Sequence, residues 1–172
     1  MTNIIQLLEF EEGWRETAYL CTEGYPTIGY GFKLGPKITG PKPAALAKCR
    51  KLYSFKLPKP AGEVWLIETA QAKFEDMCAL PHILKAVTTC REAHPDTPDY
   101  ANPRTCVLIS MAFQMGVDGL ADFVNTLRHI ANADWFQAET NMLKSKWASQ
   151  TPNRARRHAR QMRSGEWDPE YS

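Results

Sequence analysis

The sequence predicts a mainly helical α+β fold in which a small antiparallel sheet is confined to the first quarter of the chain. Its 172 residues suit one compact domain, or two lobes that share one core. Hydrophobic residues make up 44% and charged residues 23%, an ordinary globular composition that argues against disorder of the whole chain. Strand-forming residues gather near the N-terminus, whereas helix-start signals recur throughout the second half.

The first expected elements are a short helix and a hairpin. Asn3 begins a variant of the capping box, and the apolar spacing after it predicts a helix that ends at Gly13. Residues 17–21 and 25–30 are rich in strand formers, and the Thr-Glu-Gly turn between them completes a hairpin signal.

The middle of the chain is expected to be loop around two helices. Residues 35–60 contain five prolines and many lysines, which predicts a loop with one short helix near 44–52. A longer helix is predicted over 64–80, followed by Pro81, which caps, restarts or kinks it. Residues 93–103 contain three prolines and two aspartates, so they are expected to form a surface loop.

Three capping signals open the predicted helices of the second half. Asn102 precedes Pro103, a pair that suits the N-cap and first position of an apolar helix running through Phe113. Asp134 and Thr151 mark two further helix starts. We therefore expect almost the whole second half to be helical.

The net charge of +2 is unevenly distributed along the chain. Residues 24–62 contain eight Lys or Arg and no acid, and residues 140–165 contain seven and again no acid. Such stretches suit a polyanionic or wall-like target, and they equally suit a solvated surface. Charge alone therefore leaves the partner open.

Cysteine and histidine usage argues against disulfides and metals. The five cysteines are scattered and form no C-x-x-C pair, which indicates free thiols. The four histidines form no metal-binding pattern, so we expect neither a metal ion nor another cofactor.

No apolar run reaches the roughly 18 residues of a membrane span. The first residues lack the features of a cleavable signal peptide, so we expect the protein to start in the cytoplasm.

Glu12, Cys21 and Thr27 form the strongest candidate site. Glu12 lies at the end of the first predicted helix, where the helix dipole suits a protonated general acid better than a carboxylate anion. Cys21 and Thr27 lie six residues apart across the tight turn of the hairpin, so their side chains can approach each other and the helix end. A surface glutamate and a core cysteine would give the same pattern, and composition alone does not separate the two interpretations.

The same residues resemble a known family. Glu12-Gly13 and the run TEGYPTIGYG over 22–31 are similar to the N-terminal signature of the T-even-type phage lysozymes, glycoside hydrolase family 24. That signature begins with a catalytic Glu. After eight further residues comes an Asp or Cys, and after another five comes a Thr. The block 113–128 resembles the family's cleft-forming helices, and the block 144–168 is closer still, whereas 35–100 resemble it only weakly.

The resemblance implies a lysozyme-like, two-lobed fold that forms a single catalytic domain over residues 1–172. The N-terminal lobe of helix and sheet would cover about 13–63, and a connecting helix about 64–80. The helical lobe would cover about 81–172 and include the first helix, 3–12. A cleft between the lobes would bind the glycan strands of peptidoglycan.

The implied activity is that of a phage endolysin, which hydrolyses the β-1,4 bond between N-acetylmuramic acid and N-acetylglucosamine and lyses the host cell. Glu12 would protonate the leaving oxygen, while Cys21 and Thr27 would activate or hold the attacking water. Inversion is the predicted outcome, because Thr27 has an obvious role only if a water must be held. A thioglycoside would also be a poor intermediate to hydrolyse.

Three positions depart from the family pattern. Cys21 stands where Asp is common, and it could act as the base, as a group that positions water, or as a nucleophile. A thiol with a reference pKa of about 8.5 is only a few per cent thiolate at pH 7. Phe32 replaces a common His, so an ion pair made there by relatives cannot form. Lys33 replaces an apolar contact.

The resemblance also implies residues that bind substrate or support the site. Substrate contacts fall at Phe113, Thr126 and Asn141. Phe113 equally suits plain core packing. As isolated residues, Thr126 and Asn141 would more often face solvent, and only the match of their block to the family favours a substrate contact. Gln114 is expected to support the cleft, and Arg154 is expected to support the catalytic site and not only to add to a basic helix.

We expect peptidoglycan glycan strands as the partner, no nucleic acid, no stable membrane insertion, and a monomer. The protein would stay in the host cytoplasm until a holin-type pore releases it to the periplasm at lysis.

Two other classes of function fit parts of the sequence. A nucleic-acid-binding helical domain could use the arginines of 154–163, but these lack a partner helix and aromatic interleaving. A wall-binding module without catalysis is disfavoured because Glu12 is intact.

Overall fold

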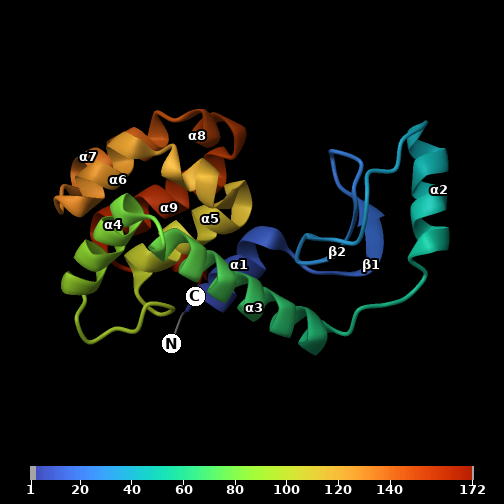
Figure 1. Cartoon of the computed structure of the whole chain (residues 1–172), viewed down its shortest axis with the longest axis horizontal. Helices are drawn as coiled ribbons and strands as arrows, with labels where there is room; N and C mark the ends of the chain where they lie inside the picture. The colour runs from blue at the N-terminus through green and yellow to red at the C-terminus, as the bar shows by residue number, and fades with distance from the viewer. Residues whose placement is uncertain (1–2, 172) are drawn as a thin grey trace. The chain divides into compact units, whose positions relative to one another are not determined.

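The computed structural model describes residues 3–171 and shows a mainly helical protein with one small antiparallel sheet (Figure 1). The predicted α+β class is therefore confirmed. The described elements, in chain order, are α1 (Ile4–Glu12), β1 (Arg15–Leu20), β2 (Pro26–Gly29), β3 (Phe32–Lys33), α2 (Lys42–Leu52), α3 (Lys59–Cys78), α4 (Pro81–Glu92), α5 (Pro103–Ala121), α6 (Val124–Ala131), α7 (Trp135–Leu143), α8 (Lys146–Gln150), α9 (Pro152–Ser164) and the 3-10 helix η1 (Pro169–Tyr171).

The chain divides into two compact units. The first, called the sheet unit here, runs from Leu8 to Ile67. The second, called the helical unit, combines the residues before Leu8 with those from Glu68 onward. Both boundaries fall inside a helix, one in α1 and one in α3. The expectation that both units act as one catalytic domain stays a prediction.

The sheet unit is organised by a short hairpin. The strands follow the order β1-β2-β3 with antiparallel neighbours, and Tyr19 lies opposite Thr27. The turn closes through two backbone hydrogen bonds, from the N–H of Cys21 to the carbonyl of Tyr25 (3.0 Å) and from the N–H of Gly24 to the carbonyl of Cys21 (2.9 Å). Gly24 has a φ of +87°, a left-handed conformation that side chains disfavour, which explains a glycine at this point of the turn.

Helix α2 packs one face against this hairpin. Its buried Ala45 and Cys49 join Ala18 and Ile38 in a small hydrophobic cluster. The helix begins at Lys42, two residues earlier than predicted, because a proline is tolerated in the first turn, where its missing N–H would have no helical partner.

Helix α3 also starts earlier than predicted, at Lys59 and not at residue 64. Pro60 follows directly, and a proline in the first turn removes no intrahelical hydrogen bond. The helix ends at Cys78, and Pro81 opens α4. Of the three roles considered for Pro81, the structure therefore shows a helix restart.

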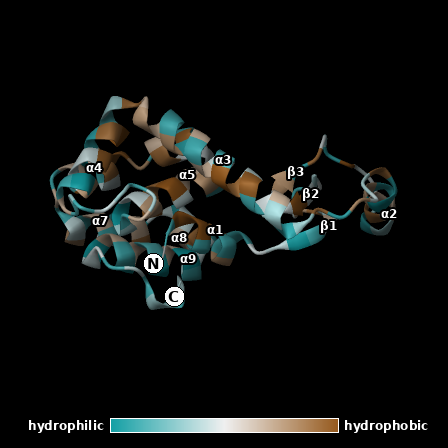
Figure 2. Ribbon diagram, turned by 90° about the horizontal axis from the view of Figure 1, so that it is seen from below, coloured by the Kyte–Doolittle hydropathy of each residue, from teal (hydrophilic) through white to brown (hydrophobic). Residues whose placement is uncertain are grey.

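Helix α5 forms the buried centre of the helical unit. Its first ten residues, 103–112, are all buried, and Figure 2 shows the hydrophobic colouring of this helix. The side-chain oxygen of Asn102 accepts the N–H groups of Arg104 and Thr105, each at 3.1 Å, which confirms the predicted cap. The helix runs beyond Phe113 to Ala121, with a non-helical backbone at Gly116 inside it.

The other two predicted helix starts have different outcomes. Asp134 accepts the N–H of Gln137 at 3.3 Å, so the predicted cap of α7 is confirmed. Thr151 does precede α9, but its hydroxyl donates to the carbonyl of Trp147 at 3.2 Å and makes no cap contact. The hydroxyl that was expected to cap α9 is thus hydrogen-bonded to a carbonyl group of the preceding helix α8.

Two further expectations concern membranes and cysteines. Within residues 3–171, no single helix is both long and apolar enough to cross a membrane, although α5 and α6, bent by 100° from each other, together meet the length and composition criteria. All five cysteines are free, as predicted. They are Cys21, Cys49, Cys78, Cys90 and Cys106.

The packing of α3 against Trp14 gives a test of the sheet unit. A Cβ atom at Gly62 would collide with the Trp14 ring. Gly62→Ala should lower the free energy of unfolding by about 1–3 kcal/mol, because the Trp14 ring or the backbone of α3 must shift to make room for the new methyl group. Urea denaturation followed by circular dichroism measures this change. In a Trp14→Leu background the same substitution should cost much less, and equal costs in both backgrounds would contradict the packing.

Candidate active site

Glu12 is the last residue of α1 and belongs to the sheet unit. The helix stops there because Gly13 adopts a φ of +64°, as expected for a glycine that ends a helix. The Glu12 side chain is half-buried and is directed at the exposed Gly31, where an added Cβ would lie 3.9 Å from Glu12 Oε2. The carboxyl group is therefore held beside the end of β2 and keeps access to solvent.

Cys21 and Thr27 lie close together on the hairpin. Thr27 pairs with Tyr19, and paired residues of antiparallel strands point to one side. Cys21 lies one residue beyond the end of β1, and a hydrogen bond between its thiol and the Thr27 hydroxyl brings these two side chains together. Thr27 is 2% exposed, whereas the Cys21 side chain is only half-buried, so the thiol can meet a ligand or water.

The turn of the hairpin stabilises the Cys21 thiolate. Burial acts to raise the pKa of the thiol, but hydrogen bonds from the backbone of Tyr25, Glu23 and Gly24 and from the Thr27 hydroxyl outweigh burial, so the pKa of Cys21 is lowered. The Thr27 hydroxyl also donates to the carbonyl of Tyr25 at 3.0 Å. Because a hydroxyl has one hydrogen, Thr27 can serve either this carbonyl or the sulfur at any moment.

Tyr19 is a residue of this site that the sequence prediction missed. Burial raises the pKa of Tyr19, Arg15 opposes that shift, and the negative charges of Cys21 and Glu12 add to it. Both groups therefore act on the same phenol. The Arg15 guanidinium lies 4.6 Å from the centre of the Tyr19 ring. The signal that could have found Tyr19 was its alternation with Cys21 along one strand.

A cavity of about 520 Å³ adjoins Cys21 within the sheet unit. Its lining combines the turn residues with the apolar Leu20 and Ile38 and the cationic Lys37 and Lys42. The turn contributes the acidic Glu23, so Cys21 lies at the wall of a hollow lined by two lysines and one glutamate. We call Glu12, Tyr19, Cys21 and Thr27 the hairpin cluster.

The two other positions that depart from the family pattern make contacts of their own. The Phe32 ring meets Trp65 edge-on, with 5.5 Å between ring centres. Lys33 Nζ lies 4.1 Å from the centre of the Tyr25 ring and 3.8 Å from a carboxylate oxygen of Glu23. Lys33 therefore contacts an aromatic ring through its charged ammonium group, where the family pattern has an apolar side chain.

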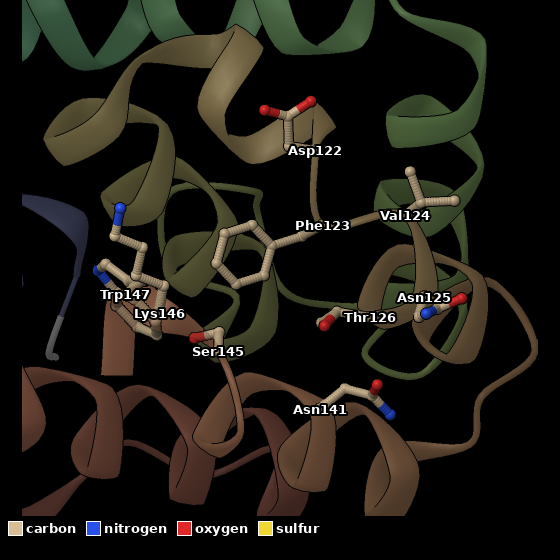
Figure 3. A pocket seen from close by; sticks show the side chains of 9 residues that line it. All are labelled: Asp122, Phe123, Val124, Asn125, Thr126, Asn141, Ser145, Lys146 and Trp147. Atoms are coloured by element: carbon tan, nitrogen blue, oxygen red, sulfur yellow. The ribbon is translucent and has the colours of Figure 1, made fainter. Parts of the chain in front are cut away.

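A second hollow, in the helical unit, holds two of the residues assigned to substrate contacts. Thr126 on α6 and Asn141 on α7 line a pocket of about 270 Å³ (Figure 3). Thr126 is 4% exposed, and Asn141 Nδ2 donates to the carbonyl of Gln137 at 2.8 Å, which leaves its side-chain oxygen as an acceptor. Phe123 and Trp147 add aromatic surface to the same wall. Figure 3 shows Thr126 and Asn141 on neighbouring helices, facing the hollow between them.

Phe113 and Gln114 lie on α5, outside the lining of that pocket. Phe113 is half-buried, which suits core packing and contact with a ligand alike. Gln114 Oε1 accepts a hydrogen bond of 2.8 Å from Trp147 Nε1. Since Trp147 lines the pocket, this hydrogen bond to Gln114 holds the Trp147 ring in its orientation at the pocket wall.

Arg154 differs from the other arginines of α9. Its side chain is buried, with 7% of the residue exposed, whereas Arg156, Arg160 and Arg163 are exposed. Its Nη2 atom donates to Ser110 Oγ at 2.9 Å and lies 3.4 Å from the Ser110 carbonyl oxygen. A buried guanidinium with a fixed direction is typical of a positioned group and not of a solvated charge.

No group of three or more His, Cys, Asp or Glu side chains within residues 3–171 is arranged to hold a metal ion. The chemistry of the hairpin cluster is instead that of a carboxyl group, a thiol with a lowered pKa, a phenol and a hydroxyl. Such a set can donate a proton and can hold and activate a water.

Comparison with known proteins points to one family. A family model described as phage lysozyme matches residues 9–161. Probable T4-type lysozyme 1 of Dictyostelium discoideum is 29% identical over 159 residues, covering 91% of each chain. The pre-baseplate central spike protein Gp5 of Enterobacteria phage T4 is 29% identical over 159 residues, which cover 90% of this chain and 26% of that protein. Probable T4-type lysozyme 2 of Dictyostelium discoideum is 23% identical over 158 residues, again with 91% of each chain covered.

The matched region contains both parts described above. Residues 9–161 include the hairpin cluster of the sheet unit, and they include the pocket and Arg154 of the helical unit. The family and the names of the relatives support a lysozyme-like glycosidase activity. The chain belongs to the phage lysozyme family.

Proposed function

We propose that the protein hydrolyses the β-1,4 bond between N-acetylmuramic acid and N-acetylglucosamine in bacterial peptidoglycan. The observation that carries this proposal is the hairpin cluster, because it combines a half-buried carboxyl group beside Gly31 with a thiol of lowered pKa and a buried hydroxyl on the hairpin. Glycoside hydrolysis needs one group that protonates the leaving oxygen and one that activates water or attacks the sugar. The cluster supplies candidates for both tasks.

Glu12 is the proposed general acid. It protonates the glycosidic oxygen as the bond breaks and leaves as a carboxylate. A position beside Gly31 suits this task, because the absence of a side chain there leaves room for a sugar to approach the carboxyl group.

Cys21 and Thr27 are proposed to hold and activate the attacking water, which inverts the configuration at the anomeric carbon. The lowered pKa of Cys21 supports a base, because more thiolate is present near neutral pH. The hydroxyl of Thr27 can turn from the Tyr25 carbonyl toward a water or the sulfur. Direct attack by the thiolate is the competing route, and it would give retention.

The pocket of Thr126 and Asn141 is the proposed site for part of the glycan. N-acetyl sugars present an amide and hydroxyl groups together with an apolar methyl group. The pocket offers the corresponding polar side chains beside the rings of Phe123 and Trp147. Phe113 is proposed as a further apolar contact, and Gln114 as the residue that orients Trp147.

The proposed biological role is lysis of a bacterial host, with release from the cytoplasm through a holin-type pore and action as a monomer on glycan strands. The competing nucleic-acid role depends on the arginines of α9. Two of these are compensated by acids near the C-terminus, since Arg157 pairs with Glu170 at 3.1 Å and Arg160 with Asp168 at 2.7 Å. The compensated charge favours the wall over a polyphosphate.

Replacing the proposed acid tests the function. Glu12→Gln keeps the side-chain volume but removes the transferable proton, so it should abolish clearing of outer-membrane-permeabilised Gram-negative cells. The matched control is Glu16→Gln, at an exposed glutamate that pairs with Lys56 at 2.9 Å and should leave the rate nearly unchanged. A Glu12→Gln enzyme that folds and keeps more than about a tenth of the wild-type rate would remove Glu12 from this role.

Selective alkylation tests Cys21. Burial raises the pKa of the other four cysteines, in the case of Cys90 to about 12, so iodoacetamide near neutral pH should react first with Cys21. Mass spectrometry of tryptic peptides identifies the modified residue, and turbidity clearing measures the activity. Activity should fall in step with modification of Cys21. An enzyme that stays active after complete modification of Cys21 would show that this residue has no catalytic role.

A further inference from the structure

The side chain of Tyr30 joins the two chain segments that flank the proposed acid. Tyr30 Oη donates a hydrogen bond of 2.5 Å to Glu9 Oε1, on the last turn of α1. On the other side of Glu12, the Trp14 ring packs against the Tyr30 ring, with 5.0 Å between ring centres. One side chain therefore contacts a residue before Glu12 and a residue after it, and all four belong to the sheet unit.

Glu9 and Tyr30 are each one short step from Glu12. Glu9 precedes Glu12 by three residues, and its carbonyl accepts the N–H of Gly13 at 3.1 Å, so the two glutamates share the turn that closes the helix. Tyr30 directly precedes Gly31, beside which the Glu12 carboxyl group lies. The hydrogen bond from Tyr30 to Glu9 thus ties the end of α1 to the segment that faces the acid.

The phenol of Tyr30 is the donor in this hydrogen bond. Tyr30 is 1% exposed, and burial raises the pKa of its phenol well above the ordinary value, with the hydrogen bond to Glu9 and the charges of Glu9 and Glu63 adding to the shift. The phenol therefore keeps its hydrogen near neutral pH. Lys59 Nζ also lies 3.5 Å from Glu9 Oε1, but 54% of the Lys59 side chain is exposed, and an ion pair of this kind contributes little.

Hydrophobic packing does not require the Tyr30 hydroxyl. A plain phenyl ring would fill the same space against Trp14, and a buried hydroxyl is costly unless it is hydrogen-bonded. One such hydrogen bond returns only about 1 kcal/mol of net stability. What the hydroxyl adds is a directional link to Glu9, at the turn of the helix that carries the proposed acid.

The geometry points to Tyr30 and Glu9 as positioning residues that hold the Glu12 carboxyl group in the orientation required for proton transfer to the glycosidic oxygen. Their hydrogen bond holds the last turn of α1 against the segment that contains Gly31, and the packing of Trp14 on the same ring holds the chain that follows. A catalytic group misplaced by about 1 Å can cost about 100-fold in rate. This inference rests on the proposed function, in which Glu12 is the general acid.

The first test removes the hydroxyl and keeps the ring. Tyr30→Phe should lower kcat about fivefold while KM changes less than about twofold, because the acid acts in the chemical step. Soluble glycan fragments of peptidoglycan serve as substrate. The matched control is Tyr53→Phe, in the same unit, whose hydroxyl donates to the Leu34 carbonyl at 3.4 Å and should be dispensable for kcat. An unchanged kcat in Tyr30→Phe, or an equal loss in the control, would overturn the proposal.

A second set of variants changes the acceptor. Glu9→Gln keeps an acceptor for the phenol and should retain most of kcat, whereas Glu9→Leu has none and should lose about as much as Tyr30→Phe. Equal kcat values for the Gln and Leu variants would contradict the proposal. Lys59→Met removes the exposed ion pair and should leave kcat within about twofold of the wild-type value. A loss there as large as in Tyr30→Phe would assign the effect to charge and would also overturn the proposal.

The double variant separates a positioning role from a purely structural one. Glu9→Leu leaves the buried phenol without this partner, so it should lower the temperature of thermal unfolding. Adding Tyr30→Phe removes the unsatisfied hydroxyl and should restore part of that stability, but kcat should stay low because the link to α1 is still missing. Recovery of kcat together with stability would overturn the proposal, since it would show that the hydrogen bond serves the fold alone.

The outcomes separate this inference from the proposed function. If Glu12→Gln abolishes activity while Tyr30→Phe leaves kcat unchanged, the function stands and the inference fails. If Glu12→Gln stays active, the proposed function fails, and the inference fails with it because Glu12 is then no acid that needs positioning.

Discussion

The pairing of β1 with β2 is the constraint on which the candidate site depends. Because Tyr19 lies opposite Thr27, these two side chains share one face of the hairpin, and Cys21 in the adjoining turn is hydrogen-bonded to Thr27. A slip of one residue in this register would turn one strand's side chains to the opposite face. The turn that fixes the register is also the source of the hydrogen bonds that stabilise the Cys21 thiolate. Fold and thiol chemistry therefore have a common origin in Gly24 and its neighbours.

The helical unit uses polar groups in a different way. Its core is built on α5, whose first ten residues are buried, so a polar side chain there is stabilised by a hydrogen-bond partner. Asn102 satisfies the first N–H groups of the helix, and Ser110 accepts from Arg154. The same helix carries Gln114, which holds the ring of Trp147 at the pocket wall. One buried helix thus supports both the pocket and the buried arginine.

Local signals in the sequence predicted most of the fold. The caps at Asn102 and Asp134 are short-range patterns, and both predictions were correct. The starts of α2 and α3 were placed too late, because prolines suggested loop where they open a helix. The Glu12, Cys21 and Thr27 spacing came from family resemblance and the hairpin. The Tyr30–Glu9 contact joins residues 21 apart in the chain, and no local pattern announces such a pair.

The central claim is that the hairpin cluster delivers a water to the anomeric carbon while Glu12 protonates the leaving group. Proton NMR of the first product formed on glycan fragments tests this claim most directly, because the anomer reports which face of the sugar was attacked. A water held by Cys21 and Thr27 gives inversion, so the new reducing end should appear first as the α-anomer and mutarotate later. An initial β-anomer would contradict the account, and it would assign direct attack on the sugar to the Cys21 thiolate.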